Sequence, residues 1–347
     1  MQQTPRVQLQ DRLAKWMPSG APQRRRPGPE AGGLQHARDL AARHAVFIVL
    51  VVMVAIFSGL SPSTFPTVGN WVAMVQSQAI LLVLALGVTI PLRSGDFDLS
   101  IAATMGFAGA VIGVLTANHG VPTAAGIMIA LTVGLVIGAL HAVLIVGVGL
   151  DAFVTTLGTM TALGGLAFAV TNSFIITGLP DDLLEFSRHK IFRLPLSAFY
   201  GWSLAFVLWY VYEHTPVGRF LLFVGGNRDA SRLAGLPVKR IRALAFISAA
   251  VISSFGGVLL VGTLGAVDPS VGPSFLLAPY AAAFLGATTI QPGRFNVWGT
   301  VLALYLIIVG ITGLQLLGAQ PWVTDLFTGS ALVAALLFAR FTRARSS

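Results

Sequence analysis

Long apolar stretches separated by short polar segments dominate the chain from residue 44 onward. Ten of them approach the length of a membrane-spanning helix, which needs about 20 mostly apolar residues. We expect these helices at 44–61, 69–92, 98–117, 121–146, 152–176, 197–213, 242–266, 275–291, 295–318 and 323–341. The pattern predicts an all-α, polytopic integral membrane protein with about ten transmembrane helices.

The composition agrees with a membrane protein. Of the 347 residues 55% are hydrophobic and 10% are charged, whereas a soluble domain has about 25% charged residues. The 38 glycines suit close helix packing in lipid, and the absence of cysteine excludes disulfides, thiol catalysis and cysteine-ligated metals. The net charge of +9 does not indicate a nucleic-acid partner, because nearly all of the basic residues lie outside the apolar spans.

The polar ends of the chain frame one apolar domain. Residues 1–43 carry Arg24, Arg25 and Arg26 between prolines and show no apolar period. We expect a disordered, basic cytoplasmic tail there. It could contact anionic membrane lipid, although a solvated tail is the simpler interpretation. A transmembrane domain over 44–341 and a short cytoplasmic tail over 342–347 complete the predicted organisation.

The basic residues predict an orientation. With the N-terminus in the cytoplasm and ten spans, only Arg188, Lys190 and Arg193 of the 22 Lys and Arg residues fall outside. Cytoplasmic loops of membrane proteins are enriched in these residues. The count therefore predicts a multi-pass plasma-membrane protein with an even number of spans and with both termini in the cytoplasm.

The loop over 214–241 is the longest strongly charged segment between apolar spans, and we expect it in the cytoplasm. Its middle reads as a very short helix. Asn227 can cap the first free N–H groups, and Asp229 lies in the first turn, where negative charge suits the helix dipole. Gly235 can end the helix, and Pro237 cannot continue it.

One face of this short helix is formed by Ala230, Leu233 and Ala234, which are spaced three and four residues apart. A helix of about eight residues is not stable alone in water. We therefore expect this face to lie against another protein on the cytoplasmic side.

The sequence holds no constellation of catalytic residues. The six histidines are scattered, no pair has the spacing of metal ligands, and no G-x-x-x-x-G-K-[ST] loop is present. His141 alone lies within a predicted span, where a packed polar residue is the simpler interpretation. We expect no enzyme activity, metal or cofactor in this chain. Asp98, Asp151 and Asp325 fall at span ends, so the mid-membrane charges of ion-coupled carriers are missing.

Neutral polar side chains are the candidates for a translocation path. They suit a neutral polyhydroxy solute, although Ser and Thr in membranes commonly bond their own or a neighbouring helix. The neutral candidates are Asn70, Gln76, Gln78, Ser100, Thr155, Thr156, Thr159 and Asn172. Asp98, which lies close to Ser100 at the start of the third span, is added to them. The G-x-x-x-G pairs Gly109–Gly113 and Gly134–Gly138 predict close helix packing.

Two further features of the sequence lead to predictions, namely one external loop and a pair of similar stretches. The segment 178–196 is the only sizeable predicted external loop, and it is either a docking surface for an extracytoplasmic partner or a solvated connector. The stretches LGVTIPLRSGDFD (86–98) and LGATTIQPGRFN (285–296) resemble each other with one gap. They indicate either an internal repeat or two chance glycine-rich corners.

Four ordered stretches resemble the permease subunits of bacterial ABC sugar importers of the ribose/xylose/arabinose type. They are the second span with the corner Gly95, Asp98, Leu99 and Ser100, the fifth span FVTTLGTMTALGGLAFAVTN, the loop TPVGRFLLFVGGNRDASRLAGLPVKRIR, and the glycine-rich segment Gly286 to Gly299. Each motif alone is weak, but their order is specific and covers most of 65–340.

The resemblance implies a permease subunit that moves a monosaccharide or similar solute inward across the bacterial inner membrane. It further implies a second permease copy or paralogue, separate ABC ATPase subunits that hold ATP and Mg²⁺, and an extracytoplasmic sugar-binding protein that largely sets specificity. The residues that would couple to the ATPase are Gly218, Arg219, Gly226, Asn227, Arg228, Ala230, Ser231, Leu233, Ala234 and Gly235.

Some positions depart from the family's pattern. Ala102 stands where a glycine is frequent, and the late corner reads Gly-Ala-Thr-Thr at 286–289 rather than Gly-Gly-Thr-Ser. The alternatives are a branched-chain amino-acid type of ABC permease, a stand-alone facilitator or ion-coupled carrier, and a membrane-embedded enzyme. The neutral candidate path and the Asp-Leu-Ser corner favour the sugar importer.

Overall fold

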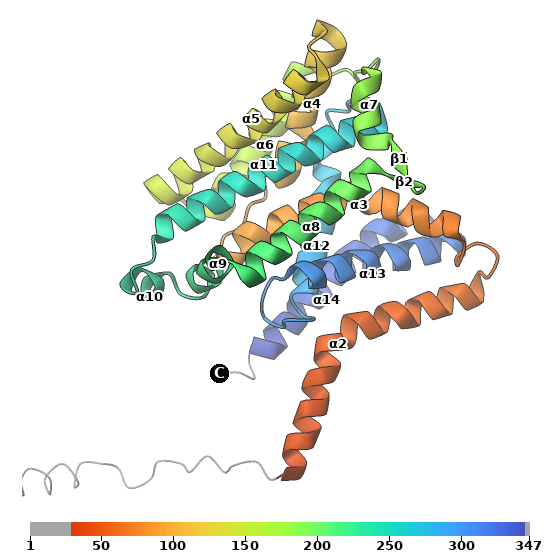
Figure 1. Cartoon of the computed structure of the whole chain (residues 1–347), viewed down its shortest axis with the longest axis vertical. Helices are drawn as coiled ribbons and strands as arrows, with labels where there is room; N and C mark the ends of the chain where they lie inside the picture. The colour runs from red at the N-terminus through yellow and green to blue at the C-terminus, as the bar shows by residue number, and fades with distance from the viewer. Residues whose placement is uncertain (1–28, 344–347) are drawn as a thin grey trace, which may run out of the picture. The chain divides into compact units, whose positions relative to one another are not determined.

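Residues 29–343 are described by a computed structural model, and their side chains are described from residue 44 to residue 337. Nearly every regular element is a helix (Figure 1). The helices are α2 (Pro29–Leu60), α3 (Val68–Arg93), α4 (Ile101–His119), α5 (Thr123–His141), the π-helix η1 (Ala142–Val148), α6 (Ala152–Val170), α7 (Asp181–Arg188), α8 (Leu196–His214), α9 (Pro216–Gly226), α10 (Arg228–Leu233), α11 (Val238–Leu264), the 3-10 helix η2 (Gly272–Phe275), α12 (Leu277–Gly286), α13 (Val297–Leu316) and α14 (Val323–Arg343). The strands β1 (Lys190–Ile191) and β2 (Leu194–Pro195) form one short antiparallel hairpin. The all-α prediction is confirmed for the described residues.

Each of the ten predicted spans overlaps a helix. Within the described residues, six helices are long and apolar enough to cross a membrane, namely α3, α4, α5 continued by η1, α6, α11 and α13. The chain is thus a polytopic membrane protein, and the count of about ten spans stays a prediction. The stretch 275–291 does not form one crossing helix, because α12 has only ten residues, or about 15 Å. Hydrogen-bonded turns follow it from Ala287 to Arg294.

The chain divides into two compact units, residues 1–41 and residues 42–347. Helix α2 begins at Pro29 and so overlaps residues 29–43 of the stretch for which a disordered tail is predicted. Ala, Leu and Arg are frequent in this stretch and are good helix formers. Residues 1–28 lie outside the described part of the chain, and so do residues 344–347 of the predicted C-terminal tail.

Helix α11 is the central helix of the second unit, because α3, α4 and α5 all pack against it. The close approach depends on glycine. The pairs Gly109–Gly113 and Gly134–Gly138 face α11 or the residues just after it, and none has room for a side chain. A Cβ at Gly138 would lie 2.5 Å from the Cα atom of Ile247. The predicted close packing at both pairs is confirmed.

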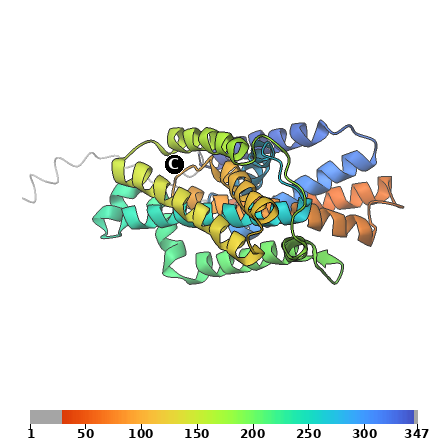
Figure 2. The same cartoon turned by 90° about the horizontal axis from the view of Figure 1, so that it is seen from above.

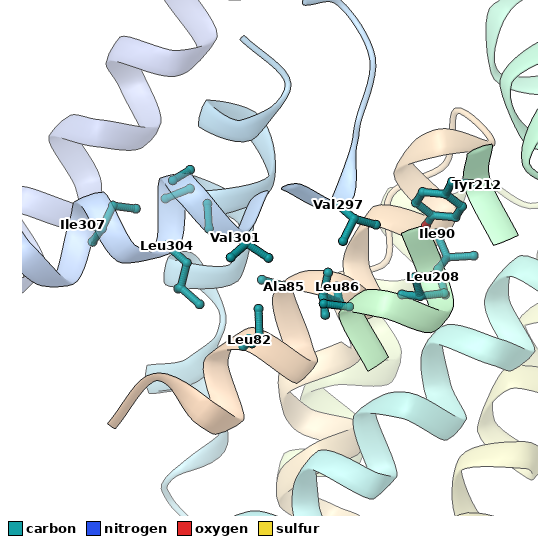
Figure 3. Close-up of a cluster of buried hydrophobic side chains, with 14 of the residues drawn as sticks. Leu82, Ala85, Leu86, Ile90, Leu208, Tyr212, Val297, Val301, Leu304 and Ile307 are labelled. Atoms are coloured by element: carbon teal, nitrogen blue, oxygen red, sulfur yellow. The ribbon is translucent and has the colours of Figure 1, made fainter. Parts of the chain in front are cut away.

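A second packing centre joins α3, α8 and α13 (Figure 3). Its side chains come from one stripe of each helix, so three helices far apart in the sequence bury a common apolar surface. The residues labelled in the close-up are Leu82, Ala85, Leu86, Ile90, Leu208, Tyr212, Val297, Val301, Leu304 and Ile307.

Different helices surround the two ends of α11. The helix has 27 residues and is therefore about 40 Å long. Helices α9 and α10 lie beside its first residues, and α7 packs near its last (Figure 1). Arg188 at the end of α7 donates from Nε to the carbonyl oxygen of Thr263 at 2.9 Å. We call these the α10 end and the α7 end; they hold the predicted cytoplasmic loop and the predicted external segment.

Candidate functional site

The short helix in the loop 214–241 is present as α10. The side chain of Asn227 accepts a hydrogen bond from the backbone N–H of Ala230 at 2.9 Å, which is the predicted cap. At the other end Gly235 has φ +82°, and the N–H of Leu236 reaches the carbonyl oxygen of Ser231 at 3.0 Å. A left-handed glycine with such a bond is a common helix stop. Both boundary signals are confirmed, although the helix has six residues rather than about eight.

The apolar face of α10 has no partner within the described chain. The side chain of Leu233 is 89% exposed, and Ala230 and Ala234 are also exposed, while Ser231 is buried and faces inward. Ala230 and Ala234 line a mostly apolar groove of about 540 Å³, together with Phe223 of α9. A short helix that presents an unburied leucine beside an apolar groove has the form of a docking element.

Helix α9 connects this element to the packed helices. Gly218 is buried against the backbone of Tyr212, where a Cβ would collide with main-chain atoms. Arg219 is exposed, and Gly226 has no atom of another segment within 4 Å of a built Cβ in the described structure. Of these three predicted coupling residues, Gly218 therefore has a clear packing role.

Beside α10 lies the turn between α3 and α4, residues 95–100, which we call the corner. Asp96 in the corner is 3% exposed and faces two arginines. Arg242 of α11 binds its carboxylate with both fork atoms, Nε to Oδ2 at 2.8 Å and Nη2 to Oδ1 at 2.7 Å. Arg228 of α10 donates from Nη2 to Oδ1 at 2.8 Å and to the carbonyl oxygen of Gly95 at 2.8 Å. Paired charges satisfy this buried carboxylate.

The predicted residues Asp98 and Ser100 sit in the same corner and are fully buried. Asp98 Oδ1 accepts from the backbone N–H and the hydroxyl of Ser100, at 3.0 and 2.6 Å. The hydroxyl of Tyr280 on α12 donates to the carbonyl oxygen of Asp98 at 2.7 Å and accepts from its N–H at 3.2 Å. The other carboxylate oxygen lies 3.9 Å from Nδ1 of His141, on α5.

The threonines of α6 mostly bond their own helix. Thr155 and Thr159 donate to carbonyl oxygens one turn back, at 2.7 and 2.9 Å. Thr156 does the same at 2.8 Å, but its oxygen also accepts from the backbone N–H of Leu99 in the corner, at 3.1 Å. Asn172 is exposed in a left-handed turn after the helix, with φ +52°. Among the described residues, Thr156 is thus the α6 side chain that forms a hydrogen bond to the corner.

The candidates on α3 lie elsewhere. Asn70 and Gln78 line a cavity of about 370 Å³ between α3, α13 and α14, together with Gln315 and Thr324. Gln76 is half-buried and does not line it. The predicted path residues are thus brought to three places, namely this cavity, the buried corner and the surface of α6, and not to one continuous cavity.

The two resembling stretches meet in space. Arg93 at the end of α3 donates from Nη1 to the carbonyl oxygen of Phe295 at 3.0 Å. Each of the two stretches turns at a glycine in the left-handed conformation, Gly95 with φ +79° and Gly293 with φ +83°. Asn296 then caps α13 by accepting from a backbone N–H at 2.7 Å. The two turns share the left-handed glycine, and an internal repeat and a chance match of two glycine-rich corners both stay open.

The α7 end presents a different surface. Phe192 at the tip of the β1–β2 hairpin is 92% exposed, and α7 begins with Asp181 and Asp182. In the loop after α11, the side chain and backbone N–H of Ser270 donate to Asp268 at 2.7 and 2.8 Å, which lowers the pKa of that carboxyl below its ordinary value. The start of α7 is therefore acidic, although Arg188, Lys190 and Arg193 follow it, and Phe192 is a prominent exposed aromatic side chain at this end.

Sequence reasoning missed Asp96 in the corner, and it missed Arg242 and Tyr280 as the side chains that bind the corner. Asp96 adjoins the predicted motif, and Arg242 closes the basic loop, so an acidic residue between two spans facing an arginine-rich loop was an available signal. Tyr280 lies in an apolar stretch with no local signal at all. In the described side chains no group of three or more His, Asp or Glu residues is placed to hold a metal.

The comparison with known proteins supports the resemblance to permease subunits of ABC importers. Residues 70–336 match the family described as branched-chain amino acid transport system / permease component. The ribose import permease of Escherichia coli is 28% identical over 294 residues, which are 84% of this chain and 91% of that protein. The D-allose transport system permease of the same organism is 26% identical over 298 residues, 86% of this chain and 91% of that protein.

A probable ABC transporter permease of Sinorhizobium fredii is 32% identical over 278 residues, 80% of this chain and 83% of that protein. No solved structure matches the chain significantly.

Proposed function

Because the chain belongs to the family of branched-chain amino-acid-type transport-system permease components, we propose that it is the membrane-spanning subunit of an ATP-driven ABC importer. It moves a monosaccharide or similar small polyhydroxy solute into the cytoplasm. The observation that carries this proposal is the near full-length match to permeases named for ribose and D-allose import. The family's description names branched-chain amino acids, which makes those the second candidate substrate class.

The exposed face of α10 is where we place the ATPase. Leu233 and the groove between α9 and α10 offer apolar surface that nothing in the described chain covers. Burying such a patch against a partner is favourable by roughly 25 cal/mol per Å². ATP and Mg²⁺ belong to that separate ATPase, and this subunit is not an enzyme and needs no cofactor of its own.

The opposite end of α11 is where an extracytoplasmic sugar-binding protein would dock, on the acidic start of α7 and the exposed Phe192. The distribution of Lys and Arg supports a cytoplasmic α10 end and cytoplasmic termini in the bacterial inner membrane. In this arrangement residues 44–341 make up the permease domain, with about ten spans, and the basic tail before it can contact anionic lipid.

A second copy of the chain, or a related permease, would cover α6. This helix packs mainly on α4, lies at the edge of the bundle in Figure 2, and is only 17% buried over its most apolar stretch. Thr155 and Thr159 on it, with Asn172 beyond it, would then border the translocation path between two subunits. Asn70, Gln76 and Gln78 are the second set of path candidates, on the α3 side of the same subunit.

The test is co-purification of the tagged chain from gently solubilised native membranes, followed by uptake in liposomes. We expect a P-loop ATPase and a binding protein whose ligand is a monosaccharide, with uptake that needs ATP. A binding protein specific for branched-chain amino acids would replace the sugar by the second candidate. A chain that purifies alone and transports without ATP would refute the importer and indicate a facilitator.

A further inference from the structure

The corner, residues 95–100, contacts four helices whose contacting residues lie far from it in the sequence. Its hydrogen bonds reach α10, α11, α12 and α6. We infer that the corner transmits the displacement of α10 to α6, with Asp96 and Thr156 as the positioning residues at its two ends. The inference rests on the proposed function, because it needs an ATPase that moves α10.

Two contacts attach α10 and the end of α9 to the corner. Arg228, the first residue of α10, binds both the carboxylate of Asp96 and the carbonyl oxygen of Gly95 with one Nη2 atom. Gly225, at the end of α9, lies so close to the corner that a Cβ built on Gly95 would be 3.2 Å from its Cα atom. A charge-assisted pair and a backbone contact together make it costly to move α10 without moving the corner.

Two other contacts hold the corner to the central helices. Arg242 binds Asp96 from α11 with both fork atoms, and the single hydroxyl of Tyr280 holds the backbone of Asp98 on both sides. Arg242 lies in the second turn of α11, and Tyr280 lies in the first half of the ten-residue α12. Because both helices are packed in the bundle, we expect a displacement of α10 to rotate the corner about these two points.

The output side is a single hydrogen bond. The backbone N–H of Leu99 donates to Oγ1 of Thr156, which is fully buried on an otherwise poorly buried helix. A polar cavity of about 440 Å³, lined by Asp151, Arg228 and Arg242, separates the start of α6 from α10. The two helices therefore do not pack directly there, and the link is provided by the corner and by α4, which follows the corner and packs on α6.

The corner also has a second arrangement within reach. Asp98 Oδ2 and both ring nitrogens of His141 have no hydrogen-bond partner among the described residues. The carboxylate oxygen and Nδ1 are 3.9 Å apart, and a displacement of about 1 Å would bring them to hydrogen-bond distance. Buried polar groups gain free energy when they become paired. A displaced corner can thus gain a contact that it lacks in this structure, which would favour the displaced position.

The test uses the complete complex with its ATPase in lipid nanodiscs. Because the chain has no cysteine, Val154→Cys on α6, whose parent side chain is 67% exposed, can carry a single environment-sensitive fluorophore. We expect ATP with orthovanadate to change its emission. Thr156→Val should reduce that change about threefold or more, because the hydrogen bond from Leu99 is lost together with the bond of Thr156 to its own helix. ATP hydrolysis and thermal stability should stay close to the parent values.

Matched variants separate transmission from stability. Thr159→Val removes a hydroxyl that bonds only its own helix, and it should leave the emission change intact, as should Thr156→Ser. On the input side Arg228→Gln should reduce the change. Arg232→Gln should not, because the partner of Arg232 within the described residues is the exposed Asp229.

The possible outcomes distinguish the inference about the corner from the proposed importer function. A parent complex that responds to ATP while Thr156→Val responds equally would overturn the inference and leave the proposed function standing. A parent complex with bound ATPase and no response at α6 would also overturn it. Failure of the parent chain to bind any ATPase would refute the proposed function itself, and the inference with it.

Discussion

Gly95 and Gly225 place two turns in direct backbone contact. A Cβ built on Gly95 would lie 3.2 Å from both the Cα and the carbonyl oxygen of Gly225. A Cβ built on Gly225 would collide with the carbonyl oxygen of Arg93. Since neither residue has a side chain, the end of α9 rests on the main chain of the corner. The loop that carries α10 is thereby part of the packed structure, not a freely moving connection.

Replacing Gly225 by alanine tests this contact. The new methyl group must push α9 away from the end of α3, and overpacking of this kind costs about 1–3 kcal/mol. We expect Gly225→Ala to lower the midpoint of thermal unfolding in detergent. Gly226→Ala is the control, because a Cβ there has no atom of another segment within 4 Å in the described structure. Equal midpoints for the two variants would contradict the contact.

Asp96→Asn tests the buried charge. The substitution keeps the shape of the side chain but leaves Arg228 and Arg242 facing a neutral group. Breaking a buried ion pair by removing one partner typically costs about 3–5 kcal/mol. The control is Asp229→Asn, whose parent side chain is exposed and pairs with Arg232 at 3.4 Å; such surface pairs contribute about 1 kcal/mol or less. We expect a large loss of thermal stability for the first variant only, and similar losses would refute a structural role for Asp96.

Signals that act within a few residues were readable in the sequence. The cap at Asn227, the stop at Gly235 and the glycine pairs of α4 and α5 all depend on spacing along one helix, and each is confirmed by the structure. The start of α2 was not readable in this way, because the Arg- and Pro-rich composition before residue 28 hid the helix-forming stretch that follows it.

Relationships across the fold could not be read from a single sequence. The pairing of Asp96 with Arg242 joins residues separated by 146 positions, and that of Asp98 with Tyr280 joins residues separated by 182. Nothing local distinguishes Tyr280 from a tyrosine that packs in an apolar span. The candidates Asn70 and Thr155 are both polar and uncharged, but they lie in different places. Composition does not show which helix faces meet.

Charge on the exposed face of α10 should affect docking and not folding. We expect Leu233→Glu to abolish co-purification of the ATPase, because a carboxylate cannot be buried in an apolar contact without a partner. Its thermal midpoint should stay within about 1 °C of the parent, as is usual for exposed sites. Phe192→Glu is the reciprocal control at the α7 end; it should keep the ATPase and weaken the binding protein. Retention of the ATPase by Leu233→Glu would refute α10 as its docking element.

The exposed face of α6 should meet a second copy of the chain. Gly158 on that face has no atom of another segment within 4 Å of a built Cβ in the described structure, so a partner helix can approach its backbone closely. We expect Gly158→Cys to form a covalent dimer on mild oxidation in membranes. Phe206→Cys on α8 is the control, since its parent side chain is 53% exposed but lies on a different helix face. The chain has no cysteine of its own, so every crosslink reports the introduced position. A dimer through Phe206→Cys and none through Gly158→Cys would place the second copy on α8, and Thr155 and Thr159 would then face lipid rather than a path.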